Sequence, residues 1–121
     1  MSEVADFGVH FFAEYCTRYN GNSLPLDDGT LDRALREVIE QEKLESPVKL
    51  NFSDTRVGLR CLELEEMVQA AYEITMIHYT DNYTGCVPSI SKEASKMLLE
   101  REGVPKSTRY FISRVLEKVR T

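Results

Sequence analysis

The fold of this chain depends first on residues 3–19, which read EVADFGVHFFAEYCTRY. Apolar side chains recur in this segment at spacings of three and four, and this periodicity predicts an α-helix. They are Val4, Phe7, Phe11, Tyr15 and Tyr19, with Val9, Phe12 and Cys16 on an adjoining strip. Because so wide an apolar face must be covered from two sides, we expect a central core helix, or a helix shared between the core and a protein interface. The interface alternative would use Phe7, Phe11, Phe12 and Tyr15.

Four further helices are predicted from the same kind of periodicity and from capping residues. They cover residues 30–43, 63–78, 92–102 and 105–119. Ser91 can cap the helix that follows it, and Gly103 permits the turn that ends that helix. Asp32 belongs to the charged side of helix 30–43, which we expect to face solvent. Residues 79–87 are interpreted as a polar connector.

In residues 47–61 the spacing between apolar side chains changes from near four residues to two. This alternation predicts a β-hairpin. Val48, Leu50 and Phe52 would alternate on one strand and Val57, Leu59 and Cys61 on the other, with residues 53–56 as the turn. The chain is therefore expected to form one mainly α domain over residues 1–121, with about five helices and a single hairpin near 47–61. A chain of 121 residues is long enough to bury an ordinary core.

Charge is distributed unevenly along the chain. The net charge is −5, but residues 1–90 hold 7 Lys and Arg against 16 Asp and Glu, whereas residues 91–121 hold 8 against 4. The net charge is therefore −9 in the body and +4 in the C-terminal segment. Fields of opposite sign indicate two surfaces that could attract different partners.

The residues that catalysis, metal binding and cofactor binding require are sparse. The chain has two histidines, His10 and His78, and no glycine-rich phosphate loop. Cys61, His78 and Cys86 lack the paired spacing of structural zinc ligands, so no metal and no cofactor are expected. An enzyme would have to use Cys86 with His78 across the loop between them. Glu3, Asp6 and Glu14 are incompatible with a signal peptide, and no segment could cross a membrane, so we expect an intracellular protein, cytoplasmic or nuclear, with free thiols.

Residues 90–119 form the segment with the clearest functional pattern: a helix, a glycine turn and a second helix. The stretch Gly103-Val104-Pro105-Lys106-Ser107-Thr108, with the helix that follows it, resembles the turn and recognition helix of helix-turn-helix DNA-binding domains. The resemblance implies that Lys106, Ser107, Thr108, Arg109 and Ser113 contact double-stranded DNA. It covers about a quarter of the chain, and about three extra residues between Ala94 and Gly103 depart from the pattern.

Three functional hypotheses follow from the sequence. The first is a small non-enzymatic protein-interaction module, that is, a subunit, adaptor or inhibitor that self-associates or docks to a larger protein through the helix 3–19 face or its acidic surface. The second is a helix-turn-helix transcriptional regulator that uses the basic helix 105–119 on DNA. An enzyme with its chemistry in the 79–86 loop is the third.

Overall fold

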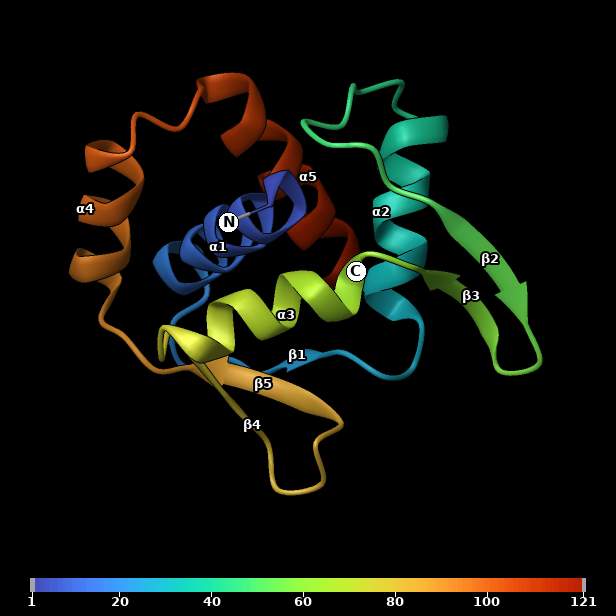
Figure 1. Ribbon diagram of the computed structural model, residues 1–121, viewed down its shortest axis with the longest axis horizontal. Helices are drawn as coiled ribbons and strands as arrows, with labels where there is room; N and C mark the ends of the chain where they lie inside the picture. The colour runs from blue at the N-terminus through green and yellow to red at the C-terminus, as the bar shows by residue number, and fades with distance from the viewer. Residues whose placement is uncertain (1, 121) are drawn as a thin grey trace.

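The computed structural model describes residues 2–120 and has helices packed around one central helix (Figure 1). The helices in these residues are α1 (Glu3–Arg18), α2 (Thr30–Glu40), α3 (Leu64–Glu73), α4 (Lys92–Arg101) and α5 (Lys106–Arg120). The strands are β1 (Leu24–Pro25), β2 (Phe52–Thr55), β3 (Gly58–Cys61), β4 (Ile77–Tyr79) and β5 (Gly85–Pro88). All five predicted helices are present, although α3 is several residues shorter than expected.

Helix α1 is the centre of the core, and it packs against α3, α4 and α5 (Figure 1). Four of its aromatic side chains are at most 2% exposed: Phe7, Phe11, Phe12 and Tyr15. The core interpretation of this helix is therefore confirmed. Gly8 makes the close approach to α3 possible, because a Cβ atom there would lie 2.5 Å from the Cα of Met67.

The prediction of a mainly α chain with a single hairpin is wrong, because the described residues contain two antiparallel sheets. β1, β5 and β4 form one sheet in that order, and β2 pairs with β3 in the other. Residues 79–87 are thus part of a second hairpin rather than a polar connector, with Tyr79 opposite Cys86. Helix α3 ends at Glu73 because Thr75 adopts a left-handed backbone conformation (φ 58°), and the β-branched residues around it favour a strand.

The predicted hairpin at 47–61 exists, but it is shorter and its turn lies further along the chain. Phe52 pairs with Cys61 and Thr55 with Gly58, so the turn residues are Arg56 and Val57. Gly58 accommodates the turn with a φ of +108°. Val57 lies at the exposed tip of this hairpin instead of facing the core.

The last two helices do not form a helix-turn-helix arrangement. Gly103 does end α4 with a positive φ, as the sequence indicated. However, α4 packs on α1, whereas α5 packs on α2 and α1, so the two helices lie on different sides of α1 (Figure 1). A DNA-binding pair needs its two helices packed against each other, with one face of the second helix open to the groove.

Candidate functional site

Helix α5 exposes few of the side chains that the DNA hypothesis requires. Lys106 and Ser107 are exposed at its N-terminus. Thr108 and Ser113 are buried, and the Ser113 hydroxyl donates a hydrogen bond to the backbone carbonyl of Tyr110 at 2.7 Å. Arg109 is turned towards Glu14 of α1. The structure therefore separates the five residues predicted to bind DNA instead of placing them on one open surface.

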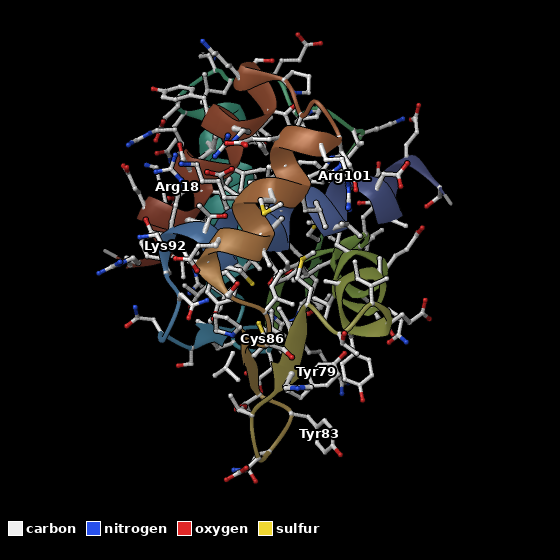
Figure 2. All side chains as sticks on the ribbon, turned by 90° about the vertical axis from the view of Figure 1, so that its left-hand side faces the viewer. Arg18, Tyr79, Tyr83, Cys86, Lys92 and Arg101 are labelled. Atoms are coloured by element: carbon white, nitrogen blue, oxygen red, sulfur yellow. The ribbon has the colours of Figure 1, made fainter. Side chains whose placement is uncertain are left out.

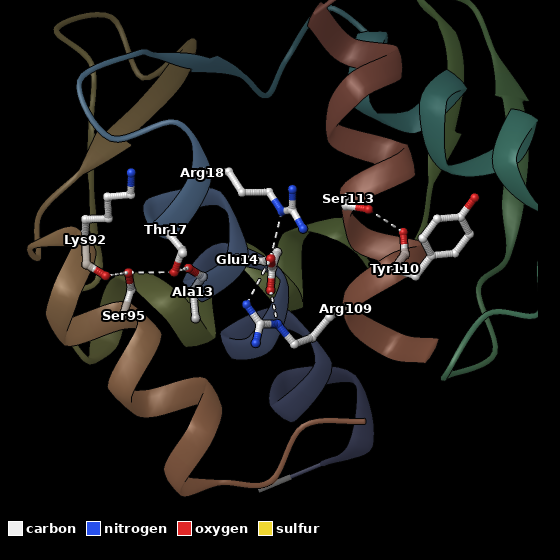
Figure 3. Close-up of polar contacts among 9 residues, drawn as sticks. All are labelled: Ala13, Glu14, Thr17, Arg18, Lys92, Ser95, Arg109, Tyr110 and Ser113. Carbon is white, nitrogen blue, oxygen red and sulfur yellow. Dashed lines mark hydrogen bonds and ion pairs between the residues drawn. The ribbon is translucent and has the colours of Figure 1, made fainter. Parts of the chain in front are cut away.

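Arg109 belongs to an ion cluster around the buried carboxylate of Glu14 (Figure 3). The Glu14 side chain is fully buried, and its carboxylate accepts hydrogen bonds from Nε of Arg109 and Nε of Arg18, each at 2.7 Å. The bonds from Arg109 join α1 to the first turn of α5, whereas the bond from Arg18 lies within α1. The hydrogen bonds to Glu14 also raise the pKa of Arg109, because they stabilise the charged form of the guanidinium group.

Other basic residues of the C-terminal segment are also paired with the acidic body. Arg114 donates two hydrogen bonds to Glu42, at 2.9 and 3.1 Å, and it also contacts Glu117. Lys118 lies 3.3 Å from Glu42 and 3.9 Å from Glu37. The hydrogen bonds from Arg114 keep the pKa of Glu42 below its usual value. Three of the eight Lys and Arg residues of this segment, Arg109, Arg114 and Lys118, are therefore paired with carboxylates of the acidic body.

The cysteine and histidine side chains considered for catalysis do not meet. Cys86 points into the core, whereas His78 is exposed and shares a hydrogen bond with the Ser89 hydroxyl at 2.9 Å. The pleat of β4 and β5 explains this, since His78 pairs with Val87, and successive side chains of a strand point to opposite faces. Burial raises the pKa of Cys16 and Cys86 to about 12 and that of Cys61 to about 11.

Three tyrosines form an aromatic ladder on the surface beside α3. Tyr72 lies in the last turn of α3, Tyr79 lies in β4 and Tyr83 occupies the loop of the β4–β5 hairpin. The ring centroids are 5.0 Å apart between Tyr72 and Tyr79 and 5.6 Å apart between Tyr79 and Tyr83. Figure 2 shows Tyr83 at the outer end of this hairpin, with Tyr79 nearer to the body of the protein. Tyr83 is 74% exposed, so much of the ladder's aromatic surface faces solvent.

The exposed side of α3 adds negative charge next to the ladder. Glu65, Glu66 and Glu73 are exposed there, and no Lys or Arg of residues 2–120 lies within ion-pair distance of them. We call this surface the acidic tyrosine face; it consists of Leu62, Glu65, Glu66, Tyr72, Glu73, Tyr79 and Tyr83. Tyrosine is enriched at protein interfaces because it combines apolar area with a polar tip.

A cleft of about 390 Å³ opens on this face. Its walls come from α3, β3, the β4–β5 hairpin and the segment before α2, and its lining residues include Glu65, Leu62, Tyr79 and Tyr83. Asp32 lines it as well, although the sequence placed this residue on a solvated face. The side chain is instead buried, because its Oδ2 accepts a hydrogen bond from the backbone N–H of Cys61 at 2.6 Å. That bond ties α2 to the end of β3.

Sequence reasoning missed this face for two reasons. The polar composition of residues 79–87 predicts a connector, although Ile77-His78-Tyr79 alternates apolar and polar residues as a short strand does. The three tyrosines also come from a helix, a strand and a loop, so no single periodicity places them together. The short alternation at residues 77–79, followed by turn residues and then by Cys86-Val87, is the sequence signal for this hairpin, but only tertiary packing brings it next to α3.

Among residues 2–120, no helix has both the length and the apolar character that a membrane span requires. No protein-family model, curated protein or solved structure matches this chain. The candidate site is therefore defined by the geometry and chemistry of its own residues.

Proposed function

We propose that the protein is a non-enzymatic interaction module that binds a cationic segment of a partner protein on the acidic tyrosine face. The observation that carries this proposal is the juxtaposition of the tyrosine ladder with a cleft that Glu65 lines, on a face where Glu65, Glu66 and Glu73 are exposed and have no cationic partner within residues 2–120. Complementary charge would steer a basic segment to the face, and the tyrosines would supply the contact area. An intracellular location suits this role, and the three cysteines are free and buried.

The other surfaces considered from the sequence offer less for a partner. Phe7, Phe11, Phe12 and Tyr15 are already covered by α3, α4 and α5 within one chain, so these four side chains contribute almost no surface for docking or self-association. On α5, Arg109 is held by Glu14 and Arg114 by Glu42, so two of the positive charges of this helix are already paired within the fold and are less available to phosphate groups. We therefore favour the protein-binding function over the DNA-binding alternative.

A random peptide library displayed on phage tests the proposal, with the folded protein as bait. We expect the selected peptides to be rich in Lys and Arg and to carry an apolar or aromatic residue. Glu65→Lys should weaken the binding of a selected peptide by about tenfold or more, because it reverses one charge in the lining of the cleft. Glu93→Lys is the matched control, since it makes the same change on α4 and should have little effect.

Amide shifts in NMR spectra locate the bound peptide and complete the test. They should concentrate in α3 and the β4–β5 hairpin. The proposal is overturned if no cationic peptide is enriched, or if Glu65→Lys and Glu93→Lys act alike. Salt-sensitive binding of duplex DNA, with amide shifts confined to α5, would replace it with the DNA-binding alternative.

A further inference from the structure

We propose that the cleft on the acidic tyrosine face binds an arginine side chain of the partner, with Asp32 accepting hydrogen bonds from its guanidinium group. This inference rests on the proposed function and names the group that the site would recognise. It depends on three features: a buried carboxylate with an unused oxygen, a neighbouring arginine that does not satisfy it, and cleft walls suited to a flat cation.

Asp32 is 1% exposed, yet only one of its two carboxylate oxygens has a hydrogen-bond partner among the described residues. Oδ2 accepts from the N–H of Cys61, whereas Oδ1 is buried and has no hydrogen-bond donor within residues 2–120. A buried charged oxygen without a donor is costly, so most such groups in folded proteins are satisfied. The unused oxygen of a residue that lines a cleft is therefore a candidate ligand contact.

Arg60 is the nearest cation, and its own contacts hold it away from this oxygen. Its Nη1 lies 3.9 Å from Oδ1 of Asp32, which is too far for a hydrogen bond. Its Nη2 donates to the backbone carbonyl of Asp27 at 2.9 Å, and Nη1 lies 3.4 Å from the carbonyl of Leu59. Arg60 thus offsets part of the charge of Asp32 but donates no hydrogen bond to Oδ1.

The remaining walls of the cleft favour a guanidinium group. Asp27, Asp32 and Glu65 contribute three negative charges against the single positive charge of Arg60, which gives a net charge of −2. The apolar walls consist of Leu26, Leu62, Leu64 and Val68, and the rings of Tyr79 and Tyr83 lie beside them. A guanidinium is planar and weakly hydrated, and it stacks on aromatic rings, whereas the ammonium of lysine is a strongly hydrated point charge. The apolar walls would contact the aliphatic stem of the arginine.

Nα-acetyl-arginine methylamide is a probe that tests this inference on the intact protein by NMR titration. We expect saturable shifts of the Cys61 amide and of the Tyr79 resonances. Nα-acetyl-citrulline methylamide has nearly the same shape without the charge, and it should bind at least tenfold more weakly. Asp32→Asn should produce a similar loss, because the amide oxygen can still accept from Cys61 while the charge is removed. Asp54→Asn is the matched control, since it makes the same change at an exposed residue of β2.

The outcomes separate this inference from the proposed function. Equal binding of the arginine and citrulline probes by the wild-type protein would overturn the inference, and this comparison does not require any variant to fold. Unchanged binding by a folded Asp32→Asn variant would overturn it as well. If cationic peptides are selected while the arginine probe fails, the protein-binding function stands and the inference falls. If the arginine probe binds while no peptide is selected, the cleft holds an arginine-like cation and the proposed function falls.

Discussion

At the scale of single residues, charge by itself did not reveal which side chains are available to a partner. Arg109 has the position and charge of a DNA contact in the sequence, but its guanidinium bonds to the buried carboxylate of Glu14. Asp32 resembles a solvated helix residue in the sequence, but it is buried with one unsatisfied oxygen. Each residue acquires its role from a partner more than 25 positions away in the chain.

Arg109→Met tests the structural role of the arginine. The substitution retains much of the apolar stem and removes two hydrogen bonds to Glu14, so we expect the free energy of unfolding to fall by about 1.5–3 kcal/mol. Urea unfolding followed by circular dichroism measures the change. Lys106→Met is the control on the same helix, and as a surface substitution it should stay within about 0.5 kcal/mol of the wild type. Equal losses in the two variants would show that the Glu14 cluster does not stabilise the fold.

At the scale of secondary-structure elements, α1 organises the molecule because three other helices use its surface. Its contact with α3 is especially close at Gly8, where the two backbones nearly touch. This contact positions α3, and therefore also the carboxylates and Tyr72 of the acidic tyrosine face. The β4–β5 hairpin follows α3 after a short turn, and the backbone carbonyl of Cys86 accepts a hydrogen bond from Tyr15 of α1 at 3.3 Å.

Gly8→Ala measures how strictly this contact is required. Alanine is about 1 kcal/mol better than glycine inside a helix, but here its Cβ would lie 2.5–2.9 Å from backbone atoms of Met67. We therefore expect a net destabilisation of about 1–3 kcal/mol, as for overpacked cores, in a thermal or urea unfolding experiment. Adding Met67→Ala should not rescue the variant, because the atoms that clash belong to the backbone. Rescue by that second substitution, or a gain in stability, would contradict the close approach.

At the scale of the whole molecule, part of the uneven charge of the chain is balanced where the C-terminal helix meets the body. Arg109, Arg114 and Lys118 each lie against a carboxylate from residues 14–42. The acidic residues of α3 have no such neighbours in the described chain, so the acidic tyrosine face retains its negative charge. Folding thus pairs part of the basic C-terminal helix with the body, whereas Glu65, Glu66 and Glu73 of α3 have no cationic partner within residues 2–120.

The three buried thiols predict how the stability of the whole domain depends on pH. Burial raises their pKa from an ordinary value of 9.0 to about 11–12 in the folded state. The unfolded chain therefore releases these protons first, and the stabilisation is complete below about pH 9 and is lost as the pH rises towards 11. Urea midpoints measured between pH 7 and about pH 10.5 should fall above pH 9, and the fall should be smaller in Cys61→Ala. Midpoints that stay flat over this range, with thiols that react rapidly with a disulfide reagent at pH 8, would contradict the burial.

The sequence by itself determined the elements that depend on local patterns. The helical periodicity of residues 3–19 and the glycine after α4 are short-range signals, and the structure confirms both. Tertiary structure decided the rest. The apolar residues around Met76 and Ile77 fit a helix or a strand equally well, and only pairing with β5 selects the strand. Likewise, whether Arg109 or Asp32 faces solvent depends on contacts with Glu14 and Cys61, which are distant in sequence. Backbone pairing and burial therefore decided where the candidate site lies, because both depend on residues that meet only in the folded chain.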